Sequence, residues 1–121
     1  MADYLPKFMG SEPFTRLTSA DVIGGRLLIA SGVNLVANSG ADAANVVGVA
    51  GFDALTGTDV TVYPRPAGVH PLVASAAITA GAKVISAAAG KIATIGAGTN
   101  AIGIALETAA ADGDVIDVLF I

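Results

Sequence analysis

Apolar residues along this chain gather in short runs that are separated by glycine, proline, asparagine and aspartate. Short apolar runs bounded by turn residues predict β-strands, and many such strands in series predict a sandwich or a small barrel. The expected strands cover residues 15–20, 26–30, 34–37, 46–50 and 60–63, and then 72–77, 82–87, 91–95, 101–106 and 115–121. An Ala-rich helix over 105–111 is the alternative for one segment. The apolar run before it and the Asp-Gly pair after it favour a strand followed by a loop.

The two halves of the chain repeat one another. Residues 16–29 align with 72–85, and residues 45–50 align with 100–105. A repeat of about 55 residues is near the lower limit for burying its own core, so we expect the two copies to share one. The predicted fold is therefore all-β, a small sandwich or barrel built from two tandem modules. The first copy is assigned to residues 14–66 and the second to residues 67–121, together forming one compact domain.

Glycines and prolines mark the expected turns. Gly25 and Gly81 follow the first strand of each copy, and we expect both to have a positive φ. Gly113 lies in an Asp-Gly-Asp turn, and Gly48 and Gly103 are counted as structural turn glycines as well. The segment that joins the copies, 64–71, contains three prolines. Because proline cannot donate to a sheet ladder, this segment is expected to be a stiff connector outside the sheets.

Residues 1–13 lie outside the repeat and are interrupted by proline and glycine, which predicts an extended N-terminal arm. Such an arm either folds back onto its own core or docks onto a partner or a neighbouring subunit. Aromatic and methionine side chains dominate the energetics of interfaces. The candidate partner or subunit contacts are therefore the large apolar residues in and next to the arm: Tyr4, Leu5, Phe8, Met9 and Phe14.

Composition narrows the classes of partner. Hydrophobic residues make up 54% of the chain but aromatic residues only 5%, so each side chain buries little area and association would add stability. The net charge of -4 and the scattered lysines and arginines argue against nucleic-acid binding. The absence of cysteine excludes disulfides and thiolate metal sites. No signal peptide is expected, and the charge-free stretches are too short and too interrupted for a membrane-spanning helix.

One segment has the spacing of a dinucleotide-binding loop. Residues 96–101 read Gly-Ala-Gly-Thr-Asn-Ala, and Asp117 follows at the distance typical of a ribose contact. Phosphate binding by such a loop needs a helix directly after it. Residues 102–105 are strand-like instead, and the first copy does not keep the glycine pattern. We therefore expect no cofactor site here.

The remaining polar residues do not form a catalytic or metal-binding pattern. His70 is the only histidine and has no carboxylate, cysteine or serine partner nearby in the sequence. Asp112 and Asp114 flank Gly113 and are expected to shape a turn, because a cation site needs more converging oxygens. Glu107 is expected at an edge with its carboxylate in water. No serine lies in a G-x-S-x-G elbow. We expect no enzyme activity, no cofactor and no metal.

The second copy resembles the tailed-bacteriophage capsid decoration (cement) proteins. The resemblance lies in the sequences Ile-Thr-Ala-Gly-Ala-Lys-Val-Ile at 78–85, Gly-Lys-Ile at 90–92, and Ile-Gly-Ile-Ala-Leu-Glu-Thr-Ala-Ala-Ala-Asp-Gly-Asp-Val at 102–115. The first copy matches less well, because Gly51, Phe52 and Asp53 replace the Leu-Glu-Thr portion. These motifs are turn-and-strand signatures of a β fold.

The resemblance implies a structural protein with a β-clip-like topology on the outer surface of an icosahedral head. It implies binding to the major capsid protein, stabilisation of contacts between capsid subunits, and a homo-oligomer, with a trimer favoured. One alternative is a β-sandwich adhesion or carbohydrate-binding module, for which only Phe52 and Tyr63 in the repeats could form aromatic platforms. Another is a non-catalytic subunit of a larger enzyme.

Overall fold

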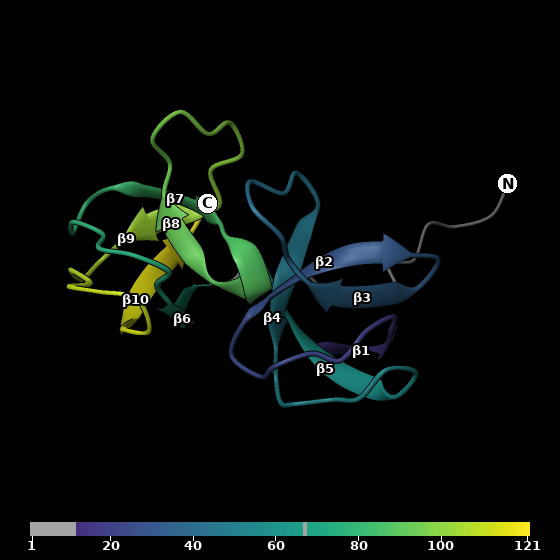
Figure 1. Ribbon diagram of the computed structural model, residues 1–121. Coiled ribbons are helices and arrows are strands. Elements are labelled where there is room, and N and C mark those ends of the chain that lie inside the picture. The colour runs from purple at the N-terminus through teal and green to yellow at the C-terminus, as the bar shows by residue number, and fades with distance from the viewer. Residues whose placement is uncertain (1–11, 67) are drawn as a thin grey trace, which may run out of the picture.

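The computed structural model describes residues 12–66 and 68–121, and it is an all-β protein. Figure 1 shows two lobes side by side, one from each half of the chain. The first module contains β1 (Phe14–Thr18), β2 (Leu27–Gly32), β3 (Leu35–Asn38), β4 (Val46–Ala50) and β5 (Asp59–Pro64). The second module contains β6 (Val69–Val73), β7 (Lys83–Ser86), the short 3-10 turn η1 (Ala88–Gly90), β8 (Ile92–Thr94), β9 (Gly103–Ala105) and β10 (Val115–Phe120).

The first module is a closed barrel with the strand order β1-β3-β2-β4-β5. Its one parallel pairing joins β1 to β3, and β1 also pairs with β5 in the antiparallel sense, which closes the ring. The remaining neighbours are antiparallel. A closed ring leaves no strand edge exposed, so a module this small can satisfy its ladder hydrogen bonds internally.

The second module repeats this topology. Its sheet has the order β6-β10-β9-β7-β8, and a parallel bridge between Ala74 and Ile92 joins the chain after β6 to the other edge. The bridge corresponds to the β1–β3 pairing of Thr18 with Val36 in the first module. Both modules therefore have the same cyclic strand order. The predicted all-β fold with two tandem modules is confirmed.

Hydrogen bonds in the loops repeat as well. The amide of Gly25 donates to the carbonyl of Ala50 at 2.8 Å, and the amide of Gly81 donates to that of Ala105 at 2.7 Å. These two glycines have the positive φ expected of them, 74° and 91°. Gly113 also lies in a turn with a positive φ, 92°. The duplication is thus preserved in backbone conformation where side chains have diverged.

The buried side chains form two clusters. The smaller fills the first barrel and consists of Val22, Leu28, Val36, Ala50, Ala54, Val60 and Val62. The equivalent seven positions of the second module all belong to the larger cluster. That larger cluster also contains Leu27, Val46 and Val49, which belong to the first module. The modules therefore meet through an apolar interface that is continuous with the core of the second module.

Two of the glycines that were predicted to lie in turns lie inside strands. Gly48 and Gly103 lie inside β4 and β9 and not in turns. A Cβ on Gly48 would collide with the carbonyl oxygen of Tyr63, and one on Gly103 would lie 2.5 Å from that of Leu119. Glycine is needed at these two positions for close approach of the neighbouring strand, which sequence reasoning took for turn formation.

The connector between the modules also differs from the prediction. β6 begins at Val69 and includes Pro71, so part of the segment that we expected outside the sheets is a strand. β6 pairs only with β10 through its ladder, which makes it an edge strand, and proline is tolerated there because an outward-facing donor is not required. Among the described residues, no helix is long and apolar enough to cross a membrane.

Candidate functional site

The loop with dinucleotide-binding spacing is engaged with a carboxylate of the same chain. The amides of Thr99 and Asn100 donate to Asp42, at 3.1 Å to Oδ2 and 2.9 Å to Oδ1 respectively. The side-chain amide of Asn100 donates to the carbonyl of Asp42 at 3.0 Å. No helix follows the loop, because Ile102 leads directly into β9. The amides that could have bound a phosphate instead join the two modules.

The hydrogen bonds to Asp42 set its electrostatics. The backbone N–H of Asn100, and then that of Thr99, stabilise the charged carboxylate and hold the pKa of Asp42 below its ordinary value. Asp42 itself has a positive φ of 48°, which non-glycine residues adopt rarely. This β3–β4 loop is therefore held in one conformation by the second module.

The other candidate polar residues also have structural contacts. Asp114 Oδ2 accepts from the amides of Ala110 and Ala111, at 2.8 and 3.1 Å, and so shapes the turn. Asp112 forms a salt bridge of 2.8 Å with Lys91, and the hydrogen bond and charge of this lysine lower the pKa of Asp112. Glu107 is exposed and accepts the amide of Asp117 at 2.8 Å.

His70 lies in β6 and packs its ring against Phe120, with the ring centroids 4.9 Å apart. It is therefore part of the side-chain packing on the sheet. Within residues 12–66 and 68–121, no three histidine, aspartate or glutamate side chains are grouped so as to hold a metal ion.

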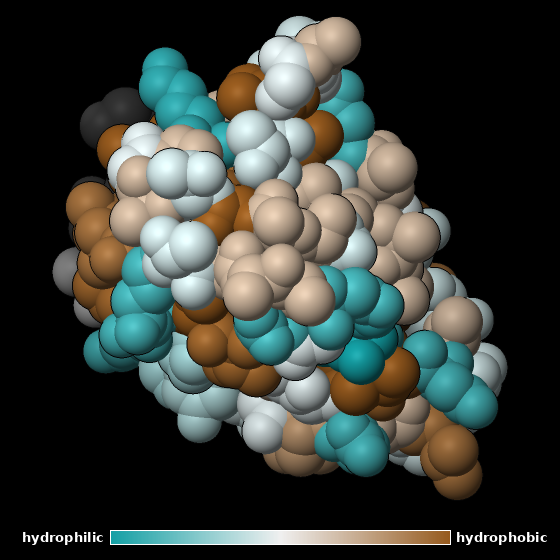
Figure 2. Space-filling view, turned by 60° about the vertical axis from the view of Figure 1, so that its left-hand side comes forward, coloured by the Kyte–Doolittle hydropathy of each residue, from teal (hydrophilic) through white to brown (hydrophobic). Residues whose placement is uncertain are grey.

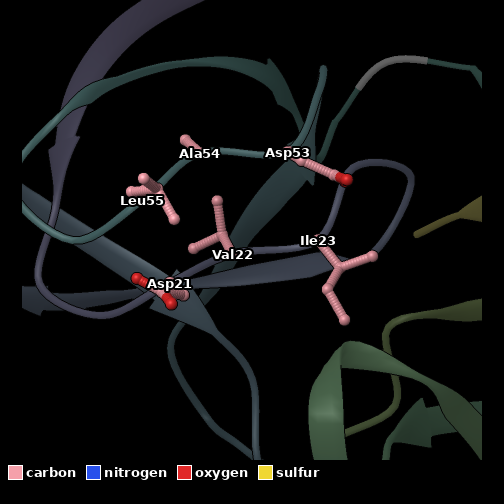
Figure 3. Close-up of a pocket in the computed structure, with 6 residues that line it drawn as sticks. All are labelled: Asp21, Val22, Ile23, Asp53, Ala54 and Leu55. Carbon is pink, nitrogen blue, oxygen red and sulfur yellow. The ribbon is translucent and has the colours of Figure 1, made fainter.

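An open apolar hollow of about 240 Å³ lies between two loop segments of the first module. Val22 and Ala54 join these segments by an antiparallel bridge. Figure 3 shows the segments side by side, with Asp21 across from Leu55 and Ile23 across from Asp53. The two carboxylates at the rim accept hydrogen bonds from nearby backbone N–H groups. Asp21 accepts from Thr56 and Asp53 accepts from Gly24, both at 2.8 Å. The same contact with Thr56 lowers the pKa of Asp21.

Large apolar side chains stand exposed around this hollow. Ile23 is 45% exposed and Leu55 is 69% exposed, and both line it. Phe52, directly before Asp53, is 49% exposed. We call Ile23, Phe52 and Leu55 the apolar patch. Figure 2 shows that, on the face it views, apolar areas are separated by polar side chains and do not merge into one large surface.

The second module lacks this patch. The positions equivalent to Ile23, Phe52 and Leu55 are occupied by Thr79, Glu107 and Ala110. The loop geometry is nevertheless the same, because Ile78 and Ala109 form the equivalent bridge. Sequence reasoning missed the patch as a site. The available signal was that the two copies differ in polarity at loop positions whose backbone they share.

Of the contact residues proposed from the sequence, only Phe14 lies in the described part of the chain. Tyr4, Leu5, Phe8 and Met9 lie outside the described residues. Phe14 begins β1, is half-buried, and packs partly against the core of the first barrel. The guanidinium of Arg16 lies 5.0 Å from the centroid of its ring, within range of a cation–π interaction.

Comparison with known proteins places the whole described chain in one family. The family model for phage cement proteins matches residues 13–120. A solved structure, the crystal structure of head fiber gp8.5 N base in bacteriophage phi29, superposes with a TM-score of 0.71 at 21% identity, covering 91% of this chain and 93% of that one. A search of the curated proteins found no match. Since the family match spans both modules, the chain belongs to the phage cement protein family, whose members are structural proteins of the virion.

Proposed function

We propose that this protein binds the outer surface of the phage head and stabilises contacts between major capsid subunits. Family membership supports a structural role in the phage virion. The observation that carries the finer proposal is the apolar patch on the first module. Exposed apolar groups that gather on a small protein mark interaction sites. The patch provides a surface that could contact the shell.

The second copy supports a role for the patch that is separate from folding. Both modules keep the same seven core positions and the same loop bridge, yet the three positions of the patch carry large apolar side chains only in the first. In the second module, Thr79, Glu107 and Ala110 allow the same backbone without that exposure. An exposed apolar cluster that the fold does not require favours a partner that covers it.

A homo-oligomer, with a trimer favoured, would suit this role. A patch of three side chains gives a weak contact by itself. Several copies joined together would engage several shell sites at once, so that the combined affinity greatly exceeds that of one contact. Sedimentation of the free protein over a range of concentrations measures whether the oligomer forms before it meets the shell.

The test of the patch is binding to heads that lack the protein. Leu55→Glu places a charge in the patch, and Ala110→Glu is the matched control because it makes the same change at the equivalent, exposed position of the second module. Both sites are exposed, so both variants should fold. We expect Leu55→Glu to weaken binding by about tenfold or more, as for a central interface residue, and the control to bind as wild type. Wild-type affinity of Leu55→Glu would exclude the patch from the contact.

The N-terminal arm remains a proposed contact through Tyr4, Leu5, Phe8 and Met9, together with Phe14. Deletion of residues 1–13 should abolish binding to undecorated heads while the β core stays folded. Circular dichroism checks the fold, and co-sedimentation with heads measures the binding. If the truncated protein saturates heads at wild-type affinity, the arm is not part of the contact.

A further inference from the structure

The second module has a surface that the first module covers. We call this surface the socket, and it includes Leu72, Ser86, Gly90 and Ile102, all of which are buried. Ser86 Oγ donates to the carbonyl of Gly40 at 2.8 Å and accepts the amide of Ala43 at 2.8 Å. The amide of Gly90 donates to the carbonyl of Ser39 at 2.9 Å. Leu72 and Ile102 share a cluster with the apolar side chains that the first module contributes, Leu27, Val46 and Val49.

The first module has the equivalent socket. Strand register shows which positions correspond. Arg16 pairs with Val60 as Leu72 pairs with Ile116, so Arg16 is equivalent to Leu72. Ala30 pairs with Val36 as Ser86 pairs with Ile92, so Ala30 is equivalent to Ser86. The positive φ of Asn34, 55°, matches that of Gly90, 72°. Val47 corresponds to Ile102, since their carbonyls accept equivalent amides, those of Arg65 and Ile121.

This first socket is much less covered than the second. Ala30 and Asn34 are exposed, and Arg16 and Val47 are only half-buried. With Phe14 and Leu35 they line a hollow of about 180 Å³. Within the described part of the chain, no module lies over it as the first module lies over the second socket. A surface that is an apolar interface in one copy is thus left open in the other.

Another copy of the chain is a poor occupant. The outer face that fills the second socket consists of Leu27, Val46 and Val49. In the second module these positions are Lys83, Ala101 and Ile104. Docking this face onto the first socket would put Lys83 on the surface that carries Arg16, whereas within the chain Leu27 and Leu72 belong to one apolar cluster. Two like charges replace an apolar pair, which opposes head-to-tail growth of modules.

The N-terminal segment fits better. The first module directly precedes the second socket in the chain, and residues 1–11 directly precede the first. Phe14 both begins β1 and lines the first socket, so the segment is attached at its rim. Eleven extended residues reach about 35–40 Å, which is ample to cover a hollow next to their attachment point. The segment carries apolar side chains at Tyr4, Leu5, Phe8 and Met9.

We propose that residues 4–9 bind in the socket of the first module of the same chain. They would cover this socket as the first module covers the socket of the second module. Attachment to the same chain gives the segment a high effective concentration at the socket. A seated segment would form one fixed surface with the barrel, and its outward side chains would remain available to a partner.

Cysteine cross-linking tests this on the free, full-length protein, since the natural chain contains no cysteine. Leu5→Cys and Met9→Cys are each combined with Ala30→Cys in the socket. The matched controls carry Ala80→Cys, on an exposed turn of the second module, in place of Ala30→Cys. A short bismaleimide is added, and intrachain and interchain products are separated by gel and identified by peptide mass spectrometry. Ala30 and Ala80 are both exposed, so folding should be retained.

We expect intrachain cross-links to Ala30→Cys, in at least one pair, about tenfold above the Ala80→Cys controls and independent of protein concentration. Predominantly interchain products would mean that a second copy's segment occupies the socket, and would overturn the proposal. So would a yield no higher than that of the controls in both pairs. Because no phage heads are present, the outcome is independent of whether the protein binds capsids.

Discussion

Gly48 and Gly103 occupy the same place in the two modules and serve the same purpose. Each lies in the central strand of its module, β4 or β9. In each case the carbonyl oxygen of a neighbouring strand, from Tyr63 or Leu119, lies too close to the position that a Cβ would take. The missing side chain therefore allows the strands to pair closely in both modules. Gly40, in contrast, has no atom near its Cβ position.

Substitution of these glycines tests that explanation. Gly48→Ala and Gly103→Ala should each lower the free energy of unfolding by about 1–3 kcal/mol, because the added methyl overlaps the backbone. Gly40→Ala is the control and should be neutral or slightly stabilising, since alanine restricts the unfolded chain. Chemical denaturation measures all three. If the strand variants are as stable as the control, the close approach is not what requires glycine.

Asp42 gives the molecule a pH-dependent contact between modules. Its pKa is lowered by amide hydrogen bonds from Asn100 and Thr99. A carboxylate with a lowered pKa stabilises the folded state at pH values above its unfolded pKa of about 3.9, and this stabilisation is lost as pH falls through the folded pKa. Asp21 and Asp112 have lowered pKa values too, so they add to acid sensitivity.

Comparison with Asp42→Asn isolates this one group. The wild type should be more stable than the variant at pH 6, and the difference should shrink steadily between pH 5 and pH 2, as Asp42 becomes protonated. Denaturation curves at several pH values in this range measure the difference. A difference that does not change with pH would show that the Asp42 carboxylate contributes no charge-dependent stability.

At the scale of elements, β2 contributes to both cores. Leu28 points into its own barrel, and Leu27, next to it, joins the cluster of the second module. Both side chains are 0% exposed. Alternation along a strand directs neighbouring residues to opposite faces, so β2 is buried on both sides at its start, at Leu27 and Leu28. This strand therefore ties the two modules together.

Leu27→Ala should thus lower the free energy of unfolding as much as a truncation in the core, even though the Leu27 side chain points out of its own barrel. We expect a loss of about 2–5 kcal/mol in the free energy of unfolding, from lost burial and the cavity left behind. Leu55→Ala is the control at an exposed position and should change stability by less than about 0.5 kcal/mol. A small effect at Leu27 would mean that the module interface adds little to stability.

Most elements could be predicted from sequence because short apolar runs and glycine turns are local signals. The strand containing Val46–Ala50, for instance, was expected with the bounds that the structure shows. β6 was misplaced because three prolines normally exclude a strand, and only its position at the sheet edge permits one. The roles of Gly48 and Asp42 depend on contacts between distant segments, which no local pattern reveals.

At the scale of the whole molecule, the duplication is conservative in fold and divergent in surface. The two modules share strand order, core positions and loop hydrogen bonds. They differ at the interface between the modules and at the solvent-exposed surface. For example, Leu27 of the first module corresponds to Lys83 of the second, and Leu55 corresponds to Ala110. Because the backbone is common, these differences indicate positions whose side chains are not fixed by folding. The apolar patch and the open socket are two such differences.

The most direct test of the cement role is the stability of heads with and without the protein. Purified protein is added to DNA-filled heads that lack it, bound copies are located by cryo-electron microscopy, and DNA release is followed on heating. We predict density on the outer surface between major capsid subunits, and DNA release at a higher temperature than in undecorated heads. Heads that bind no protein, or that release DNA at an unchanged temperature when saturated with it, would contradict the account.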